Sequence, residues 1–150
     1  MQIWIDADAC PRAIKDILYR AAVRRKVSLT LVANKAMQTP PSPYIQSIKV
    51  SAGFDVADQY IVDQLEPDDL VITADIPLAA DVLAKGGYVL DPRGERLTEE
   101  NIGERLAIRD ALDELRGVGV DTGGPATFNA SDRQAFANQL DRFLTRHLGA

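Results

Sequence analysis

The sequence has very few of the residues that usually mark a secreted protein or a nucleophilic enzyme: one cysteine, one histidine and one tryptophan. A lone cysteine excludes an internal disulfide bond. The only histidine, His147, is near the end of the chain, so no Cys-His or Ser-His catalytic pair is expected. No apolar run approaches the roughly 20 residues of a membrane span, and no secretory signal is recognisable. We therefore expect a soluble, cytoplasmic protein without membrane contact.

Positive charge is also scarce, with 17 lysines and arginines against 22 aspartates and glutamates and a net charge of −5. A chain with this balance does not coat nucleic acid by long-range attraction, so any contact with phosphates must be local. The hydrophobic content, 46% of 150 residues, is sufficient for one domain with its own core.

Short β-prone runs alternate with helical patterns through residue 95. This alternation predicts the α/β fold class, with a central parallel sheet of about five strands and helices on both faces. The predicted strands are 3–5, 27–33, 48–50, 70–73 and 88–90. Residues 96–150 are expected to form a C-terminal helical extension of this 1–95 core, with helices at 98–115 and 131–148 and a glycine-rich loop at 116–129. The chain, 1–150, is thus predicted to be a single domain.

Aspartates follow three of the predicted strands. Asp6 ends the first strand, and Asp8 would point the same way if the chain stayed extended. Asp75 follows the fourth strand and Asp91 the fifth. Because ligands of parallel α/β sheets bind at the carboxyl ends of the strands, these positions predict a site there.

A further aspartate comes from a predicted helix. Asp58 precedes Ile61 and Val62 by three and four residues, so it shares their inward-facing side. A buried carboxylate needs a partner, and a convergent acidic group needs a cation to offset its mutual repulsion.

Oxygen ligands favour hard cations such as Mg²⁺ or Mn²⁺. We expect Asp6, Asp58 and Asp75 to ligate one or two of these ions, and Asp8 to complete the catalytic group by orienting a ligand or a bound water. Thr73 and Asp91 are expected to support the ligands from outside. Such a centre suits phosphodiester hydrolysis, because the metal activates water and neutralises charge on the phosphate.

Each aspartate also has a purely structural interpretation. Asp55 and Asp75 lie where helix N-caps belong, and Asp58 would favour the positive end of a helix. Asp8 and Asp91 both precede turn-forming residues. Capping does not require carboxylates to converge, so the site hypothesis rests on their convergence.

Cys10 lies just before a helix, where a lowered pKa would make it a nucleophile. A Cys-x5-Arg phosphate loop needs arginine at position 16, and Asp16 is there. A small buried thiol is therefore the expected role.

Three arginines offer a phosphate-contacting edge. Arg105, Arg109 and Arg116 are spaced four and seven apart on one predicted helix and lead into the glycine-rich loop. The alternative is that carboxylates on the same helix neutralise them: Glu104, Asp110, Asp113 and Glu114. The sequence leaves both interpretations open.

Five segments together resemble the bacterial YaiI/YqxD family over essentially the whole chain. They are WIDADACP at 4–11, GFDVADQYIVDQ at 53–64, DLVITADIPLAADVLAKG at 69–86, DPRGE at 91–95 and GGP at 123–125. That family is similar to PIN-like nucleases, which have a parallel α/β sheet and an acidic divalent-metal site at the strand ends. By this resemblance Asp6 matches the first-strand acid, Asp58 the helix-borne acid and Asp75 the acid of the Thr-x-Asp motif. Asp8 has no firm counterpart. The resemblance implies a metal-dependent phosphodiesterase acting on RNA.

Two rival functions remain at this stage. Haloacid-dehalogenase-like phosphatases also carry Asp-x-Asp after the first strand, which would make Asp6 a covalent nucleophile and Asp8 a general acid/base. The second rival is a non-catalytic domain that binds RNA or a protein through the edge formed by the three arginines. A small phosphorylated substrate and a homodimer that shares the site are also open.

Overall fold

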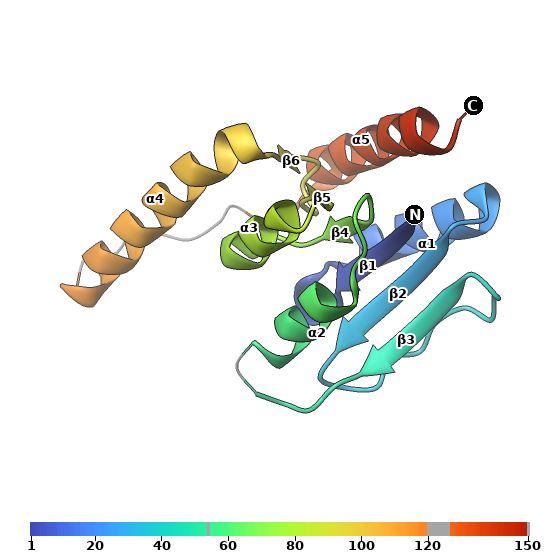
Figure 1. Cartoon of the computed structure of the whole chain (residues 1–150), viewed down its shortest axis with the longest axis horizontal. Coiled ribbons are helices and arrows are strands. Elements are labelled where there is room, and N and C mark those ends of the chain that lie inside the picture. The colour runs from blue at the N-terminus through green and yellow to red at the C-terminus, as the bar shows by residue number, and fades with distance from the viewer. Residues whose placement is uncertain (54, 120–126, 150) are drawn as a thin grey trace.

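The computed structural model describes residues 1–53, 55–119 and 127–149, and within them the strands form a six-stranded sheet in the order β3-β2-β1-β4-β5-β6 (Figure 1). The strands are β1 (Gln2–Asp6), β2 (Ser28–Ala33), β3 (Ile45–Lys49), β4 (Leu70–Ile72), β5 (Tyr88–Leu90) and β6 (Arg96–Leu97). Strands β1 to β5 are parallel, whereas β6 pairs antiparallel with β5. The predicted parallel α/β sheet is confirmed, with one added antiparallel strand.

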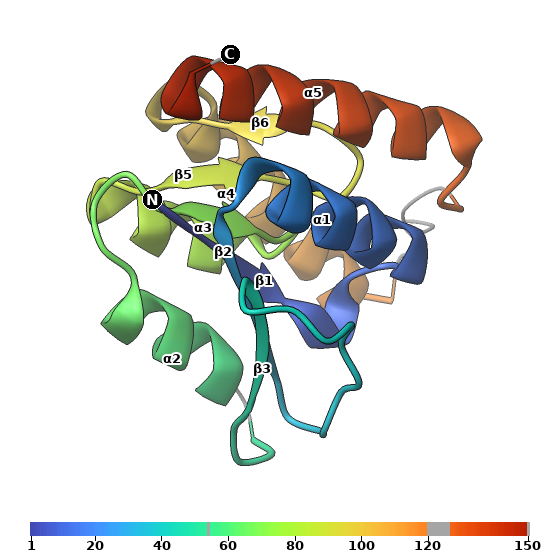
Figure 2. The same ribbon diagram turned by 90° about the vertical axis from the view of Figure 1, so that its right-hand side faces the viewer.

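Helices cover both faces of this sheet, as predicted (Figures 1 and 2). They are α1 (Arg12–Arg25), α2 (Val56–Gln64), α3 (Ile76–Ala84), α4 (Glu99–Gly117) and α5 (Ala130–Leu148), and a short 3-10 helix, η1, spans Ala7–Ala9. Because side chains alternate along a strand, Ile3 and Ile5 pack with α1 and α5, while Trp4 packs with α2 and α3. None of the helices in the described residues is long and apolar enough to cross a membrane.

Two helix starts were predicted to be capped by aspartate, and the structure confirms one of these caps. The Asp75 carboxylate accepts a hydrogen bond from the Leu78 amide at 3.0 Å and caps α3. Asp55 occupies the N-cap position of α2 with a left-handed backbone, φ 61°, and its side chain makes no capping hydrogen bond. The predicted capping role of Asp55 is therefore wrong, because this backbone conformation does not aim the side chain at the first turn.

The C-terminal part of the chain contributes to the same core as the rest. Strand β6 extends the sheet, and Phe136 of α5 is fully buried against it. Helix α4, in contrast, has no buried residue and projects from the sheet (Figure 1). Of the predicted glycine-rich loop, 116–117 end α4, and Gly123-Gly124-Pro125 lies outside the described residues.

A buried carboxylate joins the amino ends of β1 and β4. Asp69, only 3% exposed, accepts hydrogen bonds from the Gln2 amide at 2.9 Å, the Trp4 indole at 3.1 Å and the Glu66 amide at 2.9 Å. These bonds fix the register in which Trp4 lies opposite Val71. The pairing of β1 with β4 is thus held by polar contacts as well as by the strand ladder.

Replacing Asp69 with alanine is expected to lower the free energy of unfolding by about 3 kcal/mol or more, because three donors in this region lose their acceptor. Urea denaturation measures the change. Asp69→Asn keeps one acceptor oxygen and should lose less, and the exposed Asp81→Ala should stay within about 0.5 kcal/mol of wild type. Equal stabilities of Asp69→Ala and Asp81→Ala would contradict this role.

Candidate active site

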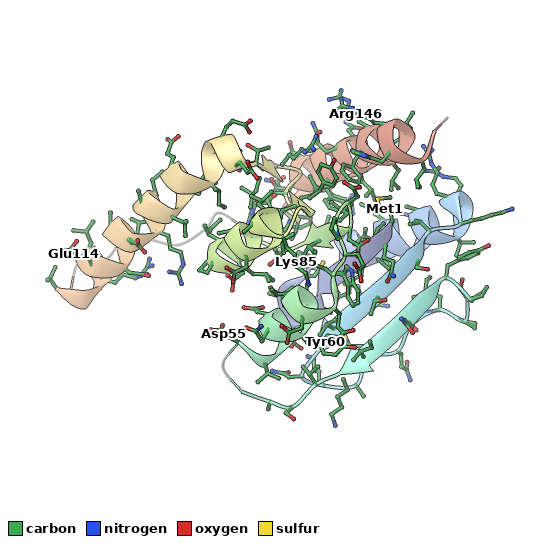
Figure 3. All side chains as sticks on the ribbon, viewed as in Figure 1. Met1, Asp55, Tyr60, Lys85, Glu114 and Arg146 are labelled. Carbon is green, nitrogen blue, oxygen red and sulfur yellow. The ribbon has the colours of Figure 1, made fainter. Side chains whose placement is uncertain are left out.

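The candidate site lies where the order of the strands reverses. From β1 the chain runs outward through β2 to β3, then returns to β4 on the other side of β1. In a parallel sheet this reversal opens a crevice at the carboxyl ends of the two central strands, which is the usual ligand site of the fold. Asp6 ends β1 and Asp75 follows β4 at this edge. The amino end of α2, marked by Asp55 in Figure 3, lies at the same edge.

A threonine connects the two strand-end aspartates. The hydroxyl of Thr73, 2% exposed, donates to Asp6 Oδ2 at 3.2 Å and accepts from the Asp75 backbone amide at 3.0 Å. Thr73 thus holds the Asp6 carboxylate and the Asp75 backbone, while the Asp75 carboxylate is held by the Leu78 amide. The predicted position of Thr73 beside the candidate ligands is the observed one.

Asp58 completes an acidic cluster, by which we mean Asp6, Asp58 and Asp75. Burial raises the pKa of Asp58 to about 7, and the negative charges of Asp75 and Asp6, together with a hydrogen bond to Asp75, add to the increase. The helix-borne acid thus reaches the strand-end acids, as its inward-facing position predicted. Near neutral pH Asp58 therefore holds a proton far more readily than an ordinary aspartate.

The charge on Asp6 is also disfavoured. Burial raises the pKa of Asp6, the hydrogen bond from Thr73 opposes the increase, and the charges of Asp75 and Asp8 add to it. A carboxyl group with this environment is typical of a site that receives a cation or a proton.

Asp8 departs from its predicted conformation. The chain does not stay extended after Asp6 but enters η1, so the condition for a shared orientation is not met, and Asp8 is exposed. Its carboxylate accepts a hydrogen bond from the Asn34 amide, at 2.8 Å. The turn alternative for Asp8 is the one observed, because alanines on both sides of Asp8 favour a helical turn as readily as an extended chain.

Asp91 lies in the turn between β5 and β6. Its carboxylate accepts from the amides of Arg93 and Glu95, at 2.9 and 3.0 Å, which is the turn-forming alternative considered above. A supporting role toward the metal stays a prediction.

The three arginines of α4 contact carboxylates. Arg105 pairs with Glu95, while Arg109 and Arg116 both pair with Asp113. Arg116 is near the outer end of α4, which Glu114 marks in Figure 3. The pairs of Arg109 and Arg116 agree with the neutralising alternative, whereas the partner of Arg105 lies outside α4 and was not expected. A phosphate-contacting role stays a prediction.

Cys10 is buried, as expected. Burial raises the pKa of its thiol to about 12, the positive charge of Lys15 opposes the increase, and Asp6 adds to it. The thiol is therefore protonated at neutral pH, contrary to the lowered pKa that a helix start suggested.

Lys15 is the charged residue of this region that sequence reasoning missed. Its ammonium and the Asp6 carboxylate both act on the Cys10 thiol, which places the cation near the carboxyl end of β1. One signal was available: α1 starts where β1 ends, so cations in its first turns must lie at the carboxyl edge of the sheet.

The acidic cluster fits a divalent cation by its chemistry. Its donors are carboxylate oxygens, which Mg²⁺ and Mn²⁺ prefer, and the charge of Asp75 raises the pKa of both Asp6 and Asp58. Within the described residues, no group of three or more His, Cys, Asp or Glu side chains already has the spacing of a metal site. Asp58 and Asp75 share a hydrogen bond instead, so a bound cation would replace a proton and draw the carboxylates together.

Comparison with known proteins gives relatives along the whole chain. A family profile described as "Uncharacterized BCR, YaiI/YqxD family" matches residues 4–146. A UPF0178 protein of Syntrophotalea carbinolica is 63% identical over 148 residues, 99% of this chain and 100% of the relative. UPF0178 proteins of Saccharophagus degradans (61% over 148 residues; 99% and 98% covered) and Dechloromonas aromatica (60% over 146; 97% of each) are similar to the same extent. These names do not describe an activity.

The pKa of Asp58 predicts a pH-dependent effect of Asp58→Asn on stability. The folded-state pKa, about 7, exceeds the ordinary value of 3.8, so the protonated form stabilises the fold and this contribution is lost as pH rises through about 7. Asparagine mimics the protonated acid at every pH. The variant should therefore gain stability relative to wild type from about pH 4 to about pH 7, with a constant gap above about pH 8.

Urea denaturation across this pH range measures the gap, with Asp81→Asn as an exposed control on α3. A gap that does not change with pH would show that Asp58 titrates normally.

Proposed function

We propose that this chain, which belongs to the YaiI/YqxD family, is a divalent-metal-dependent phosphodiesterase that acts on RNA. The observation that carries the proposal is the convergence of Asp6, Asp58 and Asp75 from a strand, a helix and a helix cap at the carboxyl ends of β1 and β4. The resemblance to PIN-like nucleases supports RNA as the substrate.

Structural roles account for two of these aspartates only in part. Asp75 caps α3 and Asp6 accepts from Thr73, but neither role requires the other carboxylate nearby. The charged form of Asp58 is disfavoured by burial and by both neighbours. An acid with a strongly raised pKa at the carboxyl edge of a parallel sheet is typical of a functional site.

In this proposal Asp6, Asp58 and Asp75 hold the cation, and Thr73 fixes the first and the last of them relative to each other. The cation, when bound, would polarise the phosphate and lower the pKa of a water nucleophile. Asp8 contributes by fixing the position of Asn34 and is not a ligand in this arrangement.

Metal binding is expected to release a proton from Asp58. Because its pKa is about 7, binding of Mg²⁺ or Mn²⁺ should tighten from about pH 6 to about pH 8 and release about half a proton at neutral pH. Titration calorimetry in buffers of different ionisation enthalpy measures both quantities. Asp58→Asn should lose the proton release, whereas Asp81→Asn should match wild type. Metal binding without pH dependence would contradict the role of Asp58.

Cleavage is expected to depend on the charges of Asp6 and Asp75. Asp6→Asn keeps an acceptor for Thr73, and Asp75→Asn keeps a good N-cap, so both variants remove charge with little change in structure. Each should lower metal-dependent cleavage of labelled single-stranded RNA by at least about 100-fold, with unchanged thermal stability. Wild-type rates in both variants would reject the proposal.

The phosphatase alternative is tested in the same experiments. A covalent aspartyl-phosphate on Asp6, formed from a phosphate monoester such as p-nitrophenyl phosphate, would favour it over hydrolysis of a diester.

A further inference from the structure

We propose that a groove beside the acidic cluster binds the phosphate backbone of single-stranded RNA, with Lys15 and Arg12 on the phosphates and Tyr19 against a base. This inference rests on the proposed function, because it places the strand that the acidic cluster would cut. It adds to that function a binding surface formed by α1 and by the chain between β2 and β3.

The groove has a volume of about 580 Å³. One wall is the first two turns of α1, with Arg12, Lys15 and Tyr19, and the other is the segment 37–40. Tyr19 is half-buried, so its ring forms part of the wall and is not free to swing into solvent. Proteins that bind single-stranded nucleic acid commonly combine an aromatic ring with neighbouring cations, because every base has a face that can stack on the ring.

Lys15 and Arg12 supply the positive charge of the groove. Lys15 Nζ contacts the Met37 sulfur at 3.6 Å, and a thioether is a weak acceptor for an ammonium. Within the described part of the chain, neither Lys15 nor Arg12 takes part in an ion pair. Asp16 also lines the groove, so two cations face one carboxylate there. In a chain of net charge −5, this is a local positive surface of the kind that a phosphate backbone needs.

The groove and the acidic cluster are neighbours. Helix α1, whose first turn carries Arg12 and Lys15, begins just after the carboxyl end of β1, where Asp6 lies, and the charges of Lys15 and Asp6 both act on the Cys10 thiol. The opposite wall is anchored at the same place, because Asp8 accepts from the Asn34 amide at the start of the segment that contains Met37. Asp8 is thus a positioning residue that holds the wall of the groove close to the candidate active site.

This arrangement resolves an electrostatic conflict. Three carboxylates repel a polyanion, and a bound cation offsets that repulsion only where it sits. Cations on the adjacent wall would hold the neighbouring phosphates while the phosphate to be cut lies at the acidic cluster. The strand would therefore be fixed by contacts on one side of the cut.

Fluorescence anisotropy of a labelled single-stranded RNA, without divalent cations, tests the groove separately from cleavage. Lys15→Gln should weaken binding about fivefold, and Lys15→Gln with Arg12→Gln about twentyfold. Each lost phosphate contact should also reduce the slope of log affinity against log salt by about 0.7. Lys15→Arg should restore most of the affinity, and Arg133→Gln, an exposed arginine of α5 outside the groove, should match wild type.

Asp8→Ala tests the positioning role, and it should weaken RNA binding about as much as Lys15→Gln without changing the salt slope, because it removes no cation.

RNA binding and metal-dependent RNA cleavage, both measured for wild type and for Asp75→Asn, distinguish this inference from the proposed function. RNA binding that depends on Lys15, without cleavage by wild type, would support the groove and reject the nuclease. Cleavage that depends on Asp75, with normal RNA affinity and salt slope in the double variant, would support the nuclease and reject the groove. Absence of RNA binding by wild type would also reject the groove.

Discussion

The pairing of β1 with β4 is the constraint on which the site depends. These strands are far apart in sequence, yet they lie side by side at the centre of the sheet. A carboxylate fixes each end of the pair: Asp69 collects three donors at the amino end, and Asp6 accepts from Thr73 at the carboxyl end. A shift of one residue between these strands would reverse every side chain of one of them and separate Asp6 from Thr73.

The two ends of this pair differ in what the carboxylate does. Asp69 is satisfied by neutral donors within the fold, so its charge has a complete set of partners. At the other end, Asp6 has one neutral donor and further carboxylates nearby. The fold therefore uses one buried acid for stability and keeps the other incompletely satisfied. That difference, and not the number of acids, distinguishes a structural carboxylate from a candidate ligand here.

The sequence predicted features that depend on local pattern. The alternation of strands and helices, the cap at Asp75, the inward position of Asp58 and membership of the YaiI/YqxD family are all confirmed. It did not predict the two-residue strand β6 or the place of Lys15, and it left the turn at Asp8 as one of two alternatives. These features depend on contacts between distant segments, such as the one from Asn34 to Asp8, or on local preferences too weak to choose between turn and strand. The roles of the acidic cluster and of the α4 arginines stay predictions.

The single thiol, Cys10, can report local opening of the chain through its rate of chemical modification. Alkylating reagents attack the thiolate, and Cys10 is buried with a pKa of about 12, so the closed structure is nearly inert to them at neutral pH. Labelling must then pass through an opening of the segment between β1 and α1, which joins Asp6 to the helix that carries Lys15. The rate of modification at this one atom would report how often the junction opens, with no cysteine introduced or removed.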